Sequence, residues 1–349
     1  MRAIAIILAA ITITLVPTSR AAIAAEPEIE RFYRGLLMKM IIRAAPGGSY
    51  DTFARLLAQH MGRHIPGQPT FLNVNMPGAS GIKAVNYIVE SAPRDGSIVS
   101  NISLGFPMQQ ALGILSKVKA DMRDFNWIGS FNATNQVLVV MTSSPTKTLA
   151  DAKQRQTLIG AASAVSTGAY LPEAYNLLLG TKFKVITGYQ AMAPVKLAME
   201  RGEVEGLGSN GWSDLQSDFA DLVDTKRLNV ILQVGMTKER DLPNVPLLID
   251  QAKNPEERAV LEFITKGNSS IGKPFATSPG VPKERVAALR MAFDATMKDP
   301  KFLADAKRSR VEIDPISGED LQKLVTDIAS TPRSVTEKAN AALGLTEAQ

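Results

Sequence analysis

The chain reads LLMKMIIRAAPGGSYDTFARLLAQHMGRHI from residue 36 to residue 65. The apolar run from Leu36 to Ala44 predicts a buried strand, because such runs are typical of strands that are covered on both faces. From Tyr50 to Ile65 the apolar residues recur at helical spacing, which predicts an amphipathic helix that stops before Pro66. A strand, a turn of small residues and a helix therefore follow one another directly.

The same alternation continues along the chain. Further strands are expected at residues 70–75, 97–103, 137–142, 158–162 and 227–234, and helices at residues 82–90, 171–179 and 194–201. After Pro282 the apolar residues again repeat at helical spacing, and further short helices follow. This order predicts an α/β fold with parallel sheets that are flanked by helices on both faces.

Length and composition indicate two globular domains. The chain has 349 residues, of which 45% are hydrophobic and 21% charged, as in proteins with a packed core. No low-complexity linker separates two halves of the sequence. We therefore expect the domains to be joined by strands that cross between them.

Residues 1–25 differ from the rest of the sequence. Arg2 precedes an apolar run from Ala3 to Val16, and the segment ends in small residues up to Ala25. A basic start, an apolar middle and a small-residue cleavage site are typical of a secretory signal peptide, and the run is shorter than the ~20 residues of a membrane span. Since no cysteine follows for a lipid anchor, we expect a soluble periplasmic protein.

The charge of the mature chain argues against nucleic acid as a partner. Cleavage would remove two of the 39 basic residues, Arg2 and Arg20, and none of the 34 acidic ones, so the net charge falls from +5 to +3. The remaining basic residues are scattered, without the aromatic-laced basic face that nucleic-acid binding favours.

The chain has no cysteine and two histidines. Disulfides, thiolate metal sites and cysteine nucleophiles are therefore excluded. His60 and His64 have the i, i+4 spacing of a two-histidine metal site, but no third ligand is evident. We interpret them as part of a solvated helix face near a helix C-terminus, and we expect no metal, no cofactor and no catalytic residue.

Four predicted junctions between a strand and a helix are rich in small residues, at residues 45–51, 75–81, 160–168 and 206–212. Helix N-termini present unpaired N–H groups, and in open α/β sheets such junctions line the ligand crevice. Because none of the four contains Lys or Arg, the expected ligand is a small carboxylate that amides, hydroxyls and water recognise. For any one junction alone, a tight turn with a polar helix cap is the alternative interpretation.

Two phosphate-type motifs are incomplete. Gly206 to Gly211 matches G-x-G-x-x-G, but the residues before it are too few and too charged for the buried first strand of a dinucleotide fold. Gly267 to Pro274 resembles a phosphate loop, but Pro274 replaces the Ser or Thr that would hold magnesium. An exported nucleotide- or dinucleotide-dependent enzyme that uses Gly206 to Gly211 is the alternative function.

Four further residues have two interpretations each. Asp51 stands in the first turn of a predicted helix behind two glycines, where it is either a capping acid or an organiser of the loop that can also accept from a ligand. Tyr50, Tyr189 and Trp212 lie beside small-residue turns, where aromatic residues are either part of a core or walls of a pocket.

Several motifs together resemble one family. Pro46-Gly47-Gly48-x-x-Asp51, Pro77-Gly78-Ala79-x-Gly81 and Ala92-Pro93-Arg94-Asp95-Gly96 are similar to motifs of the Bug-type solute receptors of tripartite tricarboxylate transporters. The similarity continues through residues 188–189, 197–204 and 279–302, and so covers nearly the whole mature chain. The resemblance implies a two-lobed periplasmic binding protein of the second type, with a ligand cleft between the lobes, that delivers an organic (di)carboxylate to membrane permease subunits.

The resemblance also implies where the ligand binds. In the family, the loops that match Pro46 to Asp51 and Ser163 to Thr167 pinch a carboxylate, partly through water; this chain has Ala164 and Val165 where the family has a glycine-containing turn. The expected ligand-binding residues are Pro46, Gly47, Gly48, Ser49, Tyr50, Asp51, Pro77, Gly78, Ala79, Ser163, Ala164, Ser166, Thr167, Tyr189, Asn210 and Trp212.

The expected organisation is a monomer of two lobes. Lobe one comprises residues 26–137 and 235–349, and lobe two comprises residues 138–234. An exported interaction protein whose lobes never close on a small molecule is a second alternative to the receptor.

Overall fold

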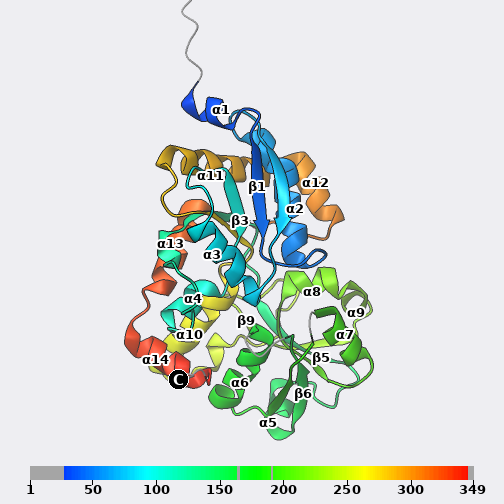
Figure 1. Ribbon diagram of the computed structural model, residues 1–349. Helices are drawn as coiled ribbons and strands as arrows, with labels where there is room; N and C mark the ends of the chain where they lie inside the picture. The colour runs from blue at the N-terminus through cyan, green and yellow to red at the C-terminus, as the bar shows by residue number, and fades with distance from the viewer. Residues whose placement is uncertain (1–26, 163–165, 190–191, 345–349) are drawn as a thin grey trace, which may run out of the picture.

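The computed structural model describes residues 27–162, 166–189 and 192–344. Its strands form two separate sheets, of six and of five strands, which lie in the upper and lower parts of Figure 1. We use lobe one for the part built on the six-stranded sheet and lobe two for the part built on the five-stranded sheet. The residue boundaries expected from the sequence stay a prediction.

The sheet of lobe one has the strand order β11-β4-β10-β3-β1-β2. Its strands are β1 (Leu37–Ile42), β2 (Thr70–Asn75), β3 (Ile98–Asn101), β4 (Asn126–Ser130), β10 (Pro274–Thr277) and β11 (Ile316–Ser317). β1 pairs in parallel with β2 and β3. β10 pairs antiparallel with β3 and β4, and β11 pairs antiparallel with β4.

The sheet of lobe two has the strand order β7-β6-β8-β5-β9. Its strands are β5 (Gln136–Met141), β6 (Thr157–Gly160), β7 (Phe183–Ile186), β8 (Gly206–Gly211) and β9 (Leu228–Val234). β6 pairs in parallel with β7 and β8, whereas β5 pairs antiparallel with β8 and β9.

The sheets are therefore mixed rather than parallel throughout, and the crossings between the lobes explain why. Successive strands that a helix joins within one lobe, such as β1 and β2, are parallel. The strands that enter from the other lobe, β5 and β10, run antiparallel to their neighbours. Residues 131–135 lead from β4 to β5, and the chain returns to lobe one after β9.

Helices cover both faces of each sheet (Figure 1). Lobe one contains α1 (Glu28–Tyr33), α2 (Ser49–Met61), α3 (Ile82–Glu90), α4 (Phe106–Ala111), α10 (Pro255–Ser269), α11 (Lys283–Met297), α12 (Pro300–Arg308), α13 (Gly318–Ala329) and α14 (Arg333–Ala342). Lobe two contains α5 (Leu149–Gln154), α6 (Thr167–Leu179), α7 (Met192–Glu200), α8 (Trp212–Asp218) and α9 (Ala220–Asp224). In the part of the chain that the structure describes, no helix has the length and apolar character that crossing a membrane requires.

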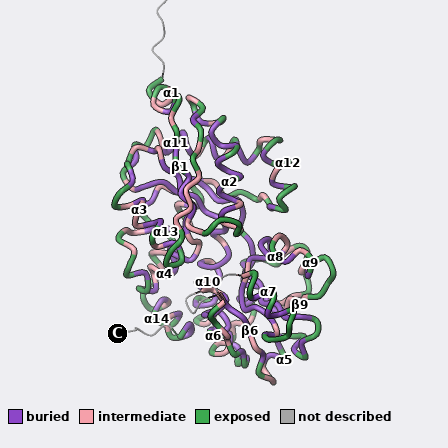
Figure 2. Tube along the Cα trace, turned by 45° about the vertical axis from the view of Figure 1, so that its right-hand side comes forward, coloured by how far each residue is buried: buried purple, intermediate pink, exposed green. Residues whose placement is uncertain are grey.

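The core of lobe one is aromatic at its centre. Phe131 packs against Phe53 of α2, Phe275 of β10, Phe293 of α11 and Phe302 of α12. A second core cluster continues from lobe one into lobe two, where the Tyr170 hydroxyl donates a hydrogen bond of 2.7 Å to Asn268 Oδ1. Figure 2 shows buried residues running through the interior of both lobes. The lobes are thus in direct contact along the side formed by α6, α10 and α14.

The two histidines do not form a solvated face. His60 is buried, and its Nε2 lies 2.9 Å from Asp305 Oδ2, while His64 Nε2 lies 2.8 Å from Asp299 Oδ2. Both aspartates belong to the segment around α12, which packs on α2 and which the helical pattern of α2 alone could not reveal. The expectation was therefore wrong for His60, because a distant helix covers that face.

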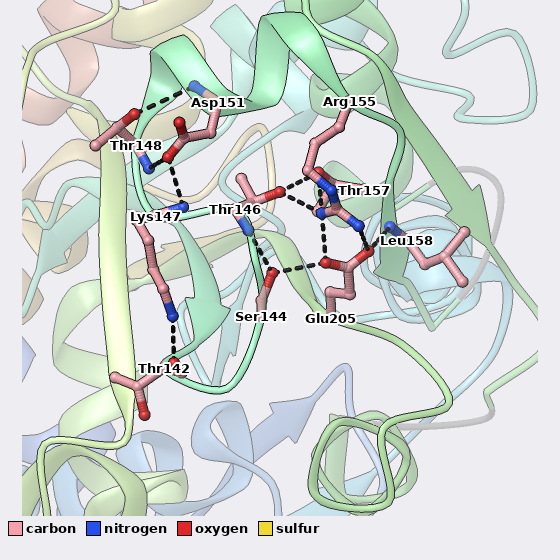
Figure 3. A network of polar contacts seen from close by, with 10 residues as sticks. All are labelled: Thr142, Ser144, Thr146, Lys147, Thr148, Asp151, Arg155, Thr157, Leu158 and Glu205. Carbon is pink, nitrogen blue, oxygen red and sulfur yellow. Dashed lines mark hydrogen bonds and ion pairs between the residues drawn. The ribbon is translucent and has the colours of Figure 1, made fainter.

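A polar network fixes the end of lobe two that lies away from lobe one (Figure 3). The Arg155 guanidinium and the Ser144 hydroxyl donate hydrogen bonds of 2.6 Å to the Glu205 carboxylate, and the N–H of Leu158 donates at 3.2 Å. Burial alone would raise the pKa of Glu205, but these donors outweigh it and lower the pKa. The charged residue directly before β8 is therefore held in place rather than left unpaired.

Candidate functional site

A cavity of about 440 Å³ lies between the lobes, and both lobes line it. Lobe one contributes Arg43, Tyr50, Ser80, Ser103, Leu104, Gly105, Phe106, Gln109 and Lys273, and lobe two contributes Gln136, Ala162, Ser166, Thr167, Asn210 and Asp214. Two of these side chains are cations and one is a carboxylate. We name it the cation-lined cavity.

Lys273 is placed at the cavity by the glycine before it. Gly272 has a φ of +66°, and a Cβ there would lie 1.3 Å from the carbonyl oxygen of Asn132, so no other residue fits. Lys273 is only 3% exposed, and its Nζ lies 2.6 Å from Asp214 Oδ2. Burial alone would lower the pKa of Lys273, but the Asp214 carboxylate raises it above its usual value, so the lysine stays charged.

Arg43 follows directly after β1 and stacks on Tyr50, in the first turn of α2. Its guanidinium lies 3.7 Å from the ring centroid, and Lys273 Nζ lies 4.7 Å from the same centroid. Burial would raise the pKa of the Tyr50 hydroxyl, but the charges of Arg43 and Lys273 outweigh it and lower the pKa. The three side chains thus form one positively charged wall.

Two long helices begin at the cavity. Tyr50 lies in the first turn of α2, and Ser166 and Thr167 lie at the start of α6; both helices have 13 residues. Helix N-termini favour negative charge, through the helix dipole and through unpaired N–H groups. Together with Arg43 and Lys273, they make the cavity suited to an anion such as a carboxylate.

The structure brings four of the predicted site residues together at this cavity, namely Tyr50, Ser166, Thr167 and Asn210. Pro46, Gly47, Gly48, Ser49, Asp51, Pro77, Gly78, Ala79, Tyr189 and Trp212 do not line it. Ser163 and Ala164, like Val165, lie outside the described residues. Tyr189 instead packs against the core of lobe two.

Asp51 lies buried behind the first loop rather than at the cavity. Its Oδ2 accepts a hydrogen bond of 3.0 Å from the N–H of Gly47, and its Oδ1 accepts from Arg55 at 2.9 Å and from Asn75 at 2.8 Å. Burial would raise the pKa of Asp51, but these donors lower it. Asp51 therefore ties the loop after β1 to the loop after β2.

Trp212 lines a different cavity of about 680 Å³ between the lobes. The other residues that line this cavity are Ala133, Asn135, Gln216, Met236, Thr237, Lys238, Glu239, Arg240, Asp241, Ser269, Ser270, Glu312, Ile313 and Asp314. Four of these residues carry carboxylates and two are cations. We name it the carboxylate-lined cavity.

The environment of the carboxylate-lined cavity disfavours negative charge. Burial and the neighbouring Asp241 and Asp314 raise the pKa of Glu239. A hydrogen bond from the N–H of Asn135 lowers it, but by less. Burial and the carboxylates of Glu239 and Asp314 likewise raise the pKa of Glu312. A further anion would be repelled there.

The glycine motif at residues 206–211 is not a loop. These residues form strand β8, between β5 and β6 in the middle of a sheet, and the helix begins only at Trp212. A Cβ on Gly206 would lie 2.1 Å from the carbonyl oxygen of Val139, and one on Gly208 would lie 2.0 Å from Pro172 Cγ of α6. Glycine is therefore needed at these positions because the neighbouring backbone and Pro172 lie so close. The prediction of a small-residue loop at residues 206–212 was wrong, and so was the alternative of a dinucleotide site there.

The site expected from the sequence contains no cation and does not include Arg43, Lys273 or Asp214. Arg43 falls within the predicted first strand, and Lys273 falls within the incomplete phosphate-loop match. The position of Arg43 between an apolar run and a Pro-Gly-Gly turn was a usable signal. Nothing local pointed to Lys273 and Asp214, which are 59 residues apart and meet only when the lobes come together.

No protein-family model and no curated protein matches the sequence. Among solved structures, a TctC solute binding protein from Polaromonas, solved without ligand, matches with a TM-score of 0.63 and 21% identity, covering 88% of this chain and 99% of that chain. An R. palustris protein with adipate matches with a TM-score of 0.66 and 18% identity, over 88% of this chain and 97% of that chain. The periplasmic binding protein BugD matches with a TM-score of 0.65 and 17% identity, over 89% and 98%.

Two of these neighbours, the TctC solute binding protein and BugD, are of the type that the resemblance in the sequence indicated. The match extends over nearly the whole of each neighbour, so it includes both lobes. The chain therefore has the two-lobed α/β fold of the periplasmic solute-binding proteins.

Proposed function

We propose that the protein is an extracytoplasmic solute-binding receptor, which captures an organic carboxylate between its lobes and delivers it to a membrane permease. The observation that carries the proposal is the cation-lined cavity, where Arg43 and Lys273 lie beside the first turn of α2 in lobe one and face the N-terminus of α6 in lobe two across the gap. The shared fold with solute-binding proteins, one of them solved with adipate, supports it.

In this proposal the ligand carboxylate is held by charge and by hydrogen bonds from both lobes. Arg43 offers a planar fork that suits a carboxylate, and the hydroxyls of Ser166 and Thr167 lie on the opposite wall. A ligand that touches both walls binds the closed arrangement best and so draws the lobes together. The proposal assigns no catalytic residue, no cofactor and no metal.

The remaining expectations from the sequence become part of the same proposal. The receptor would be exported by the signal peptide at residues 1–25, which lie outside the described residues, and would act as a monomer in the periplasm. Its partners would be a small carboxylate and the permease subunits of a tripartite transporter. The loops at Pro46 to Asp51 and Pro77 to Ala79 would position the walls of the cavity.

Two measurements test the proposal. Mass spectrometry of small molecules retained through gentle purification should detect an organic acid, and calorimetric titration with a panel of mono-, di- and tricarboxylates should find at least one that binds. A retained nucleotide without any acid would contradict the receptor proposal. If no acid binds and none is retained, the protein is better explained as an interaction protein and the receptor proposal fails.

A further inference from the structure

A buried ion pair joins the two lobes at the cation-lined cavity. Asp214 lies in the first turn of α8 in lobe two, and Lys273 precedes β10 in lobe one. Asp214 is 6% exposed and Lys273 is 3% exposed, and the oxygen in contact with Lys273 is Oδ2. Since both residues line the cavity, the pair forms part of the surface that a ligand would meet.

The pair leaves one strong acceptor without a partner. Asp214 Oδ1 is buried and has no hydrogen-bond partner among the described residues, although a carboxylate oxygen can accept more than one bond. Arg43 Nε and Asn210 Nδ2, which are donors at the same cavity, also lack a partner in the described part of the chain. A ligand that forms hydrogen bonds with all three groups must accept from Arg43 and Asn210 at one end and donate to Asp214 at the other.

The charges indicate which kind of donor fits. Lys273 already neutralises Asp214 at 2.6 Å, so an ammonium group beside Oδ1 would meet the charge of Lys273 as well. A hydroxyl donates to Oδ1 without adding charge. Arg43 then remains as the cation for the carboxylate of the ligand.

We propose that Asp214 makes the cavity selective for hydroxycarboxylates by accepting a hydrogen bond from the ligand hydroxyl at Oδ1; this inference rests on the receptor function proposed above. A hydrogen bond to a charged group is stronger than a neutral one, and an analogue without the hydroxyl leaves the buried acceptor unpaired. The hydroxy acid should therefore bind at least about tenfold more tightly than the same acid without the hydroxyl.

The test uses two series of acids, one of monocarboxylates and one of dicarboxylates, because the sequence does not indicate the chain length of the ligand. Within each series the acids differ only in carrying a hydrogen, a hydroxyl or an amino group. Calorimetric titration compares propionate, lactate and alanine, and then succinate, malate and aspartate, with both enantiomers of each substituted acid. The wild-type chain should prefer the hydroxy acid in whichever series binds, followed by the amino acid. In Asp214→Asn, Lys273 holds the amide oxygen and the NH2 group faces the ligand. The ligand hydroxyl then exchanges a hydrogen bond to a carboxylate for a weaker one from a neutral amide, so the preference should fall below about threefold.

Asp218→Asn is the matched control. Asp218 lies one turn further along α8, is exposed, and lines neither cavity, so the preference should stay as in the wild type. If thermal melting shows that Asp214→Asn does not fold, Asp214→Asn combined with Lys273→Gln replaces the ion pair by a neutral one, and the same ratio of affinities is measured.

Each outcome bears on the inference. A preference for the hydroxy acid that Asp214→Asn removes and Asp218→Asn keeps supports it. Equal binding of hydroxy and unsubstituted acids, or a preference that survives in Asp214→Asn, overturns the selectivity while the receptor function stands. Tighter binding of every acid in Asp214→Asn also overturns it, because Asp214 would then be competing with the ligand for Lys273. If the wild type binds no acid in either series, the inference fails, whereas the receptor function fails only if the wider panel and the mass spectrometry also find no acid.

Discussion

The two cavities between the lobes differ in charge, although both are lined by residues of both lobes. The cation-lined cavity carries Arg43 and Lys273 against one carboxylate, whereas the carboxylate-lined cavity carries two cations against four carboxylates and is larger. The larger cavity is thus the poorer site for an acid, because size supplies no counter-charge. We therefore expect the charges at the edges of the lobes, rather than the shape of the gap, to decide which cavity holds a carboxylate.

Lys273→Met should have the largest effect on ligand affinity. The change removes a cation from the cavity and leaves Asp214 buried without its partner, so affinity for the best acid should fall at least about a hundredfold and stability by about 3–5 kcal/mol. Titration calorimetry and chemical unfolding measure the two effects. Combining Lys273→Met with Asp214→Leu should recover stability but not affinity.

The control for Lys273 lies in the other cavity. Lys238 is exposed at the carboxylate-lined cavity, so Lys238→Met should leave the affinity unchanged within about twofold. A loss of affinity in Lys238→Met that equals the loss in Lys273→Met would remove the distinction between the two cavities.

Arg43→Gln should have the next largest effect. It removes the fork above Tyr50 but leaves Lys273 paired, so affinity should fall about tenfold with stability little changed, since Arg43 is only half buried. Arg240→Gln removes the same charge from the carboxylate-lined cavity and should not weaken binding. Unchanged affinity in Arg43→Gln would mean that the ligand carboxylate does not reach this wall.

Tyr50 and Trp212 should differ in their effect on affinity, because each lies at a different cavity. Tyr50 lies between Arg43 and Lys273, whereas Trp212 lines the carboxylate-lined cavity. Tyr50→Phe should weaken binding about threefold, through the loss of a hydroxyl at the cavity, and Trp212→Phe should change it less than about twofold. A larger loss in Trp212→Phe than in Tyr50→Phe, measured by the same titration, would shift the site to the carboxylate-lined cavity.

The smallest effect concerns pH and stability. Because the fold raises the pKa of Glu239, the folded state binds a proton more readily than the unfolded chain, so ionised Glu239 destabilises the fold at neutral pH and protonation relieves this as pH falls. Glu239→Gln should therefore be more stable than the wild type at pH 7, by less than about 1 kcal/mol, and the difference should shrink towards pH 5. Thermal melting at several pH values measures it, and a difference that does not depend on pH would contradict the account.

The sequence predicted the elements around the first loop well, because their signals are local. The strand at residues 70–75 and the helix at residues 82–90 have the predicted bounds, and the apolar run after Leu36 contains β1. Hydrophobic periodicity and helix-stopping residues were sufficient for these elements. The predicted fold class is also confirmed by the two helix-flanked sheets and by the solute-binding neighbours.

Interactions between distant segments could not be predicted in the same way. β8 has the composition of a turn, and only its packing against Val139 and Pro172 explains its glycines. His60 is covered by α12, and Lys273 meets Asp214 across the two lobes. Four of the predicted binding residues line the cavity, but the pairing of Lys273 with Asp214 joins two lobes and no local pattern indicates it.

A crystal structure of the protein with the tightest-binding acid would show which of the two cavities holds the ligand. The account predicts the acid in the cation-lined cavity, with its carboxylate within hydrogen-bond distance of Arg43 and with contacts to Ser166 or Thr167 across the gap. An acid bound in the carboxylate-lined cavity beside Trp212, or held by one lobe alone, would contradict it.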